Sequence, residues 1–242
     1  MIAYVAKDLG SGRTLAAHAE LRLPAYSTIK VLLAAAFWRM VADGELDEAE
    51  VHDCTPGTFV GGSGVLRGLR HPAALSLADI LHLALVVSDN DASNIIAERV
   101  GFTRVNELAE SLGLISTRMQ RLMLDHRAVA AGRDNFTSAA DLALLLEELA
   151  TGDRLGARVT EPVLASLVLQ EHLDGLARYL PEAAVYAGKC GDDAPTGRYA
   201  HDCALVSEGE RRAVLVVLTE DAGGFETVSR TGAELYAQLC RA

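Results

Sequence analysis

Residues 24–44 have the sequence PAYSTIKVLLAAAFWRMVADG, which predicts a buried helix carrying two reactive side chains at its start. Pro24 disfavours helix before it, and Gly44 stands where a left-handed C-terminal stop is common. Between them, apolar residues surround the helix axis, whereas a surface helix would have a single apolar stripe. Ser27 and Lys30 are three residues apart and therefore share one face. A buried ammonium must be paired, hydrogen-bonded or deprotonated, so Lys30 is an unusual residue for this helix.

The composition indicates a globular protein and excludes several kinds of partner. The chain has 242 residues, 50% hydrophobic and 23% charged, which is enough to bury a large core. Its formal net charge of -11 argues against nucleic acid or an anionic membrane surface as a partner. We expect no metal and no cofactor, because the cysteines form no Cys-x-x-Cys pair and are too scattered for a disulfide framework. They are Cys54, Cys190, Cys203 and Cys240.

The sequence as given predicts a cytoplasmic protein. Residues 1–6 lack the basic and long apolar regions of a signal peptide. No apolar run reaches membrane-spanning length, because Arg39 and Asp43 interrupt the most apolar stretch. The sequence pattern indicates no particular oligomeric state.

The order of the expected elements predicts an α/β (α+β) fold. Strands at both ends with helices between them imply an antiparallel sheet built from both termini and flanked by helices, with an inserted all-helical subdomain. We expect residues 1–45 and 180–242 to form the α/β subdomain and residues 46–179 the inserted one. The expected strands cover 2–8, 14–18, 185–187, 199–206 and 213–219. The expected helices after the first cover 77–87, 92–100, 103–112, 138–150, 162–169 and 224–241.

Two long connections stand out between these elements. Residues 52–72 are rich in glycine and proline, which predicts a loop-rich connection without strand or helix. Residues 117–136 have no sustained hydrophobic period and predict a long ordered loop. Such loops in compact domains are often functional.

Three short motifs occur in order along the chain. Ser27-x-x-Lys30 is followed by Ser88-Asp89-Asn90 at the end of an apolar helix and by Lys189-Cys190-Gly191 at the end of a short strand. In this order and context they resemble the motifs of the penicillin-recognising serine hydrolases, most closely the class A β-lactamases. The resemblance covers almost the whole chain. It implies a β-lactamase-like fold and a serine hydrolase acting on a small molecule through an acyl-enzyme, in a family whose members are usually exported.

The resemblance gives each motif residue a chemical role. Acyl transfer needs a serine whose proton can leave, and an amine held neutral by burial and a cationic neighbour can accept that proton. Lys30 would be this amine for Ser27, and Lys189 would be the neighbouring cation. Ser88 would relay the proton to the leaving nitrogen. The backbone amides of Ser27 and Asp192 would form the oxyanion hole.

Other residues of the motifs would bind the substrate. Asn90 would bond Lys30 or the side-chain amide of the substrate. A simpler interpretation of the first motif is that Ser27 or Thr28 only caps the helix and that Lys30 extends its ammonium to solvent.

The third motif departs from the family pattern. Cys190, before Gly191, replaces the threonine or serine that the family uses to bond the substrate carboxylate, and a thiol is a weaker donor than a hydroxyl. Asp192 and Asp193 add negative charge at this place, which Arg198 would offset in part. We therefore expect ordinary penicillins to bind poorly and the natural substrate to be less anionic, such as an ester or amide.

The long loop also departs from the family pattern. Class A enzymes carry a glutamate there, two residues beyond an arginine, which activates the water that hydrolyses the acyl-enzyme. An ungapped count places Arg121 in the arginine position and Met123 in the glutamate position, and methionine cannot act as a base. Asp125 is the nearest carboxylate and the candidate base of this loop, although it could instead pair with Arg121 or Arg127. Slow or absent deacylation follows as a hypothesis.

Three functions remain open at this stage. The chain could be a β-lactam hydrolase, a peptidase, esterase or amidase of the same superfamily, or a penicillin-binding protein that acylates without turnover. His201-Asp202 suggests the dyad of a different serine hydrolase, but the resemblance puts it in a strand behind the site, where we expect a structural role.

Overall fold

A five-stranded antiparallel sheet in the order β2-β1-β9-β8-β7 forms the middle layer of the molecule. The computed structural model describes residues 1–55, 59–194 and 196–241. The two ends of the chain meet in this sheet, because β1 pairs along its whole length with β9. The predicted sheet from both termini is therefore confirmed. Its strands are β1 (Ile2–Asp8), β2 (Thr14–Ala17), β7 (Val185–Asp192), β8 (Tyr199–Glu208) and β9 (Arg211–Glu220).

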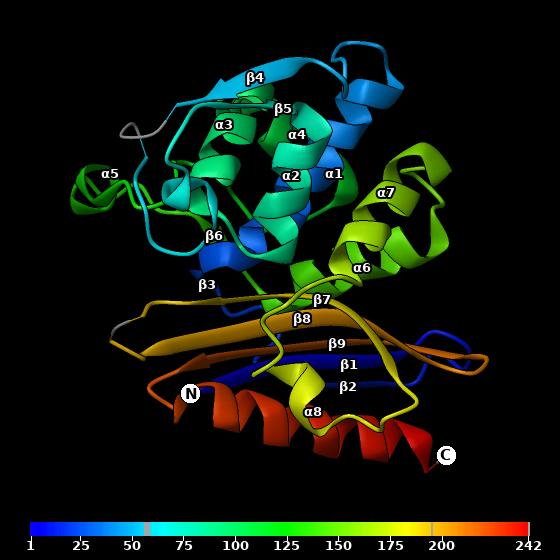
Figure 1. Ribbon diagram of the computed structural model, residues 1–242. Helices are drawn as coiled ribbons and strands as arrows, with labels where there is room; N and C mark the ends of the chain where they lie inside the picture. The colour runs from blue at the N-terminus through cyan, green and yellow to red at the C-terminus, as the bar shows by residue number, and fades with distance from the viewer. Residues whose placement is uncertain (56–58, 195, 242) are drawn as a thin grey trace.

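Helices cover the two faces of the sheet unequally. The helices of the middle region lie on one side, and the C-terminal helix α8 (Gly224–Cys240) lies along the other, together with the short helical turn of residues 176–179 (Figure 1). The middle helices are α1 (Ile29–Ala42), α2 (Leu77–Val86), α3 (Asn90–Val100), α4 (Phe102–Leu112), α5 (His126–Ala130), α6 (Ala139–Thr151) and α7 (Ala157–Leu167). Three short 3-10 helices also occur: η1 (Tyr26–Thr28), η2 (Leu66–Gly68) and η3 (Leu176–Tyr179). The division of the chain into two subdomains remains a prediction.

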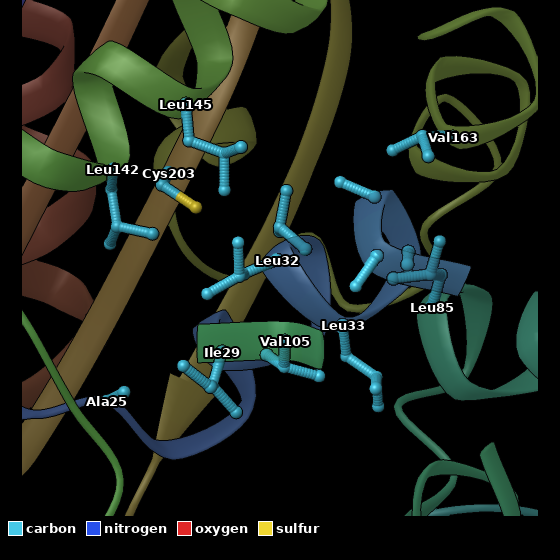
Figure 2. Close-up of a cluster of buried hydrophobic side chains, with 14 of the residues drawn as sticks. Ala25, Ile29, Leu32, Leu33, Leu85, Val105, Leu142, Leu145, Val163 and Cys203 are labelled. Carbon is cyan, nitrogen blue, oxygen red and sulfur yellow. The ribbon is translucent and has the colours of Figure 1, made fainter. Parts of the chain in front are cut away.

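Helix α1 is the centre of the larger hydrophobic core. Residues 29–37 are all buried, as the apolar residues around its axis predict. Ile29, Leu32 and Leu33 of α1 are surrounded by side chains from α2, α4, α6 and α7 and by Cys203 of β8 (Figure 2). Because other elements enclose α1, a polar group near its start is held away from bulk water.

The structure corrects three expectations about the middle region. Residues 51–54 and 73–76 form an antiparallel pair, β4 (Val51–Cys54) with β5 (Ala73–Ser76), at the ends of the connection expected to be loop only. Of that connection, residues 56–58 lie outside the described residues. Helix α3 begins at Asn90, two residues earlier than expected, because the Asp89 side chain caps it.

Helix α7 begins at Ala157 instead of Pro162. Gly156, with a φ of 75°, precedes the helix, and Pro162 lies inside it. Pro162 lies in the middle of the helix and removes one intrahelical hydrogen bond, yet α7 continues to Leu167. Two further short strands, β3 (Leu23–Pro24) and β6 (Phe136–Thr137), pair with each other, and a bridge between Arg118 and Phe136 joins the two ends of the long loop. None of the described helices is both long and apolar enough to cross a membrane.

We predict that Leu33→Ala lowers the free energy of unfolding by about 2–5 kcal/mol, because Leu33 has no exposed surface and its loss leaves a cavity. Leu173→Ala is the matched control, since Leu173 is 50% exposed and should change stability little. Urea unfolding of both variants measures the difference. Equal stability of the two variants would show that α1 is not the tightly packed centre described above.

Candidate active site

A pocket of about 370 Å³ lies between the start of the α1 region, the α2–α3 turn, the long loop and the end of β7. Six of the residues predicted from sequence line it: Ser27, Ser88, Asn90, Cys190, Gly191 and Asp192. Lys30 and Lys189 do not line the pocket but are fully buried next to residues that do. The three motifs, up to 162 residues apart in sequence, thus converge on one cavity.

Ser27 lies in η1, where the backbone takes a sharp turn into α1. The preceding residue, Tyr26, has a φ of 47°, in the left-handed region that non-glycine residues rarely adopt. The side-chain hydroxyl of Thr28 donates to the carbonyl of Ala25 at 2.6 Å, and no side chain caps α1. The interpretation of Ser27 or Thr28 as a simple helix cap is therefore wrong.

The end of β7 approaches the backbone of Ser27 very closely. A Cβ atom at Gly191 would lie 2.6 Å from the Ser27 amide nitrogen, nearer than any side chain can come. Only glycine therefore allows this approach. It brings the strand that carries Asp192 beside the first turn of the α1 region, where free amides gather.

Lys30 is enclosed by acceptors from the second motif. Its Nζ lies within hydrogen-bond distance of the Ser88 carbonyl oxygen at 2.7 Å, the Ser88 hydroxyl at 3.1 Å and Asn90 Oδ1 at 3.1 Å. Complete burial, and then the nearby charge of Lys189, hold the pKa of Lys30 well below its ordinary value. The interpretation in which Lys30 reaches solvent is therefore wrong.

Asp89 holds the backbone of the second motif in place. Its carboxylate accepts hydrogen bonds from the amides of Val65, Leu66 and Ala92 at 2.7, 2.9 and 2.9 Å. These bonds stabilise a turn in which Ser88 has a φ of 53°. The turn aims both the carbonyl and the hydroxyl of Ser88 at Lys30.

The sequence pattern did not single out Asp91, which holds the segment that leads into the pocket-lining residues Gly62 and Ser63. Its carboxylate accepts from the amides of Val60 and Gly61, just before the pocket-lining Gly62 and Ser63. Burial raises the pKa of Asp91. An aspartate in the first turn of a helix is ordinarily explained by the helix dipole, so the sequence contained no distinctive signal for this contact.

The third motif places a buried cation and a neutral thiol at the pocket. Lys189 is fully buried, and its Nζ donates to the carbonyl of Cys190 at 2.9 Å. Burial raises the pKa of the Cys190 thiol to about 11, so the sulfur is protonated at neutral pH. Gln170, another residue that sequence reasoning missed, has its Nε2 3.9 Å from this sulfur.

Met123 lies at the pocket wall. It is 5% exposed, and Asn94 holds its backbone from both sides. The Met123 amide donates to Asn94 Oδ1 at 2.6 Å, and Asn94 Nδ2 donates to the Met123 carbonyl at 3.2 Å. The loop therefore presents a thioether to the pocket at a fixed position.

Asp125 lies away from this pocket, contrary to its expected place as a candidate base. It caps α5 by accepting from the Ala128 amide at 2.9 Å. The expected pairing with Arg121 or Arg127 is also wrong, because no ion pair of Asp125 occurs among the described residues and Arg121 pairs with Asp134 at 2.6 Å. Asp134 lies near the end of the same loop. The sequence alone is compatible with Arg121 pairing with either Asp125 or Asp134.

Arg198 also lies outside the pocket, contrary to its expected place among the substrate contacts. Its guanidinium pairs with Glu220 at 2.6 Å and with Asp221 at 3.3 Å on the surface. Asp193 accepts from the Tyr199 amide at 2.9 Å and does not line the pocket. The two carboxylates that do line it are Asp174 and Asp192.

His201 and Asp202 are buried in β8 and have structural partners, as expected. His201 Nδ1 accepts from the Thr219 amide at 3.2 Å, and its Nε2 lies 3.0 Å from the Pro24 carbonyl oxygen. Asp202 accepts from the Tyr186 hydroxyl at 2.7 Å. Burial raises the pKa of Asp202 to about 6. Among the described residues, no cluster of three or more His, Cys, Asp or Glu side chains could hold a metal ion.

Comparison with known proteins agrees with this geometry. The model of the beta-lactamase enzyme family matches residues 2–241. An imipenem-hydrolyzing beta-lactamase of Enterobacter cloacae is 30% identical over 222 residues, covering 89% of this chain and 74% of the relative. The beta-lactamase regulatory protein BlaB of Streptomyces cacaoi is 31% identical over 161 residues, 65% of this chain, and the match spans only 51% of the relative.

Solved structures show the same fold. A beta-lactamase from Sphaerobacter thermophilus superposes with a TM-score of 0.89 at 27% identity, covering 99% of this chain and 90% of the other. A mutant of PBP-A, solved as an acyl-enzyme complex with penicillin G, superposes with a TM-score of 0.89 at 23% identity, covering 100% and 91%. At that identity the likeness to PBP-A concerns the fold alone.

We predict that the lowered pKa of Lys30 makes stability rise with pH. Above the folded-state pKa of Lys30 and below the ordinary value of 10.5, the unfolded chain binds one proton more than the folded chain. The free energy of unfolding should therefore increase by about 1.4 kcal/mol per pH unit across that window, relative to a Lys30→Met variant. Urea unfolding of both proteins at several pH values measures the difference. Parallel pH profiles would mean that Lys30 keeps an ordinary pKa.

Proposed function

This chain belongs to the beta-lactamase enzyme family, and on that premise we propose that Ser27 is acylated by β-lactam-like amides and releases the product slowly. The observation that carries the proposal is the fully buried Lys30, one helical turn from Ser27, whose lowered pKa favours the neutral amine over the ammonium. A neutral amine can accept the serine proton, whereas an ammonium cannot. Ser88, Asn90 and Lys189 complete the machinery of this step.

In the acylation step, the Ser27 hydroxyl attacks the carbonyl carbon of the amide. The serine proton passes to Lys30, and the developing oxyanion is bound by the amides of Ser27 and Asp192. When the C–N bond breaks, Ser88 delivers a proton to the leaving nitrogen and is reprotonated from Lys30, which is 3.1 Å from its hydroxyl. The products are an ester at Ser27 and a free amine, and Lys30 is neutral again.

Release of the acyl group needs a base that activates water, and the pocket supplies none in the usual place. Met123 lines the pocket, the ungapped sequence count assigns it the position of the family's glutamate, and a methionine cannot accept a proton. Asp125 is turned into the cap of α5. A slow second half of the catalytic cycle is therefore the expected consequence.

A second candidate is a peptidase, esterase or amidase that uses the same residues. It is favoured by Cys190, whose raised pKa of about 11 leaves a neutral thiol where the family binds a carboxylate through a hydroxyl. Both candidates share the acyl-enzyme at Ser27 and differ in the substrate that forms it. The imipenem-hydrolyzing relative instead favours a lactam substrate, because its name assigns lactam hydrolysis to it.

We predict a stoichiometric burst of product with a chromogenic cephalosporin, followed by slow turnover. Intact-mass analysis should then detect a lasting adduct, and peptide mapping should place it on Ser27. Ser27→Ala should show neither burst nor adduct. Rapid sustained hydrolysis by the wild-type protein would overturn the slow-release proposal, and the absence of any adduct or turnover with lactams would favour the second candidate.

We predict that Met123→Glu restores deacylation and raises the turnover rate after the burst by about 100-fold or more, the ordinary contribution of a positioned base. Met123→Gln is the matched control, because it has the shape of glutamate without its basicity. The rate of adduct decay by mass spectrometry measures the effect. Equal decay in the two variants would mean that this position does not govern release.

A further inference from the structure

We propose that the end of the pocket beside Cys190 recognises an organic cation on the leaving group of the substrate, in place of a carboxylate. The inference rests on the proposed function, because it concerns the same acylation at Ser27. It names the class of substrate: an amide, ester or thioester whose leaving group carries a quaternary or primary ammonium.

The first argument is the negative charge of the exposed carboxylates that line this pocket. Asp174 and Asp192 both line the pocket, and both residues are exposed. Asp192 accepts one hydrogen bond, from the Ala194 amide at 2.8 Å, and no ion pair involving Asp174 or Asp192 occurs among the described residues. A carboxylate on the substrate would be repelled here, and a cation would be attracted.

The second argument is that the basic side chains near the pocket already have polar partners. Lys189 is buried and donates to the Cys190 carbonyl. Arg198 pairs with Glu220 and Asp221 outside the pocket. Arg121 does line the pocket, but its guanidinium is held at the loop side by Asp134 and by the Leu122 carbonyl. His172 has its Nε2 3.3 Å from the Val87 carbonyl oxygen.

The third argument is the aromatic lining. Tyr26 and Phe225 contribute to the same pocket as Asp174 and Asp192. The ring of Tyr26 is held at 5.4 Å from the ring of Tyr199, so its orientation is fixed. Aromatic faces combined with carboxylates are the chemistry that binds quaternary and primary ammonium groups in proteins.

The fourth argument is the weakness of Cys190 as an anion ligand. Its thiol is protonated at neutral pH and is a poor hydrogen-bond donor. A carboxylate beside it would therefore lose its hydration without gaining strong bonds. An alkylated ammonium needs no such donors, because its charge is spread over carbon-bound hydrogens.

The test uses three thioesters that share one phenylacetyl group and differ only in the leaving thiol. The thiols are thiocholine, its uncharged tert-butyl analogue and 3-mercaptopropionate. In each reaction the Ser27 oxygen bonds to the carbonyl carbon, the C–S bond breaks, and the serine proton ends on the thiol. Loss of thioester absorbance gives the acylation rate, and intact mass gives the same adduct in all three cases.

We expect wild-type protein to be acylated by the cationic thioester on the order of tenfold faster than by the anionic one, after correction for their reactivity with hydroxide. Asp192→Asn and Asp174→Asn should each lower this ratio several-fold, and the double variant should bring it near unity. Glu182→Gln, which removes an exposed charge outside the pocket, should keep the wild-type ratio. Added salt should lower the ratio in the wild-type protein.

The uncharged thioester separates the two proposals. If it acylates Ser27 while the cationic and anionic thioesters react equally, or the anionic one faster, the cation inference is overturned and the proposed acyl-enzyme chemistry stands. A ratio that survives in the double variant also overturns the inference. If none of the thioesters forms a Ser27-dependent adduct, the inference fails, and the adduct with the chromogenic cephalosporin then decides separately whether the proposed function stands.

Discussion

The burial of Lys30 is the constraint on which the rest of the structure depends. An ammonium inside a hydrophobic core costs several kcal/mol unless it is neutralised or hydrogen-bonded. Helix α1 has other elements on all sides, so Lys30 can satisfy its polar atom only by bonding to the turn that carries Ser88 and Asn90. That turn takes a left-handed residue at Ser88, and Asp89 holds it in place. The conformation of the second motif is therefore tied to the need of the buried Lys30 for hydrogen-bond partners.

The features of the fold that the sequence predicted well are those that depend on local pattern. The apolar residues on all faces of α1 and the strands at both ends of the chain each follow from neighbouring residues. The family resemblance carried by the three ordered motifs predicted that their residues would share one cavity. The pair of β4 and β5 was missed because their pairing joins residues separated by a loop rich in glycine and proline, whose composition hides the strands at its ends.

The choice of partner among similar charges could not be predicted. Arg121 had Asp125 nearby in sequence, yet it pairs with Asp134, because the bridge between Arg118 and Phe136 brings the two ends of the loop together. The sequence position of Arg198, just after the third motif, suggested a substrate contact, but its guanidinium pairs with carboxylates at and just after the end of β9. An ion pair depends on which side chains the fold brings within a few ångströms, and surface pairs differ little in energy, so sequence spacing does not select among them.

Because the two lysines of the motifs are buried, the charge that the pocket presents to a substrate depends on its exposed residues. Burial, and then the nearby charge of Lys189, lower the pKa of Lys30. Lys189 is fully buried in β7 and donates to the Cys190 carbonyl, so it contributes electrostatic potential to the reacting centre without lining the pocket. A charged group on a substrate would therefore meet exposed side chains first. In this chain Asp174 and Asp192 are exposed carboxylates that line the pocket, so two buried lysines are combined with an acidic pocket lining.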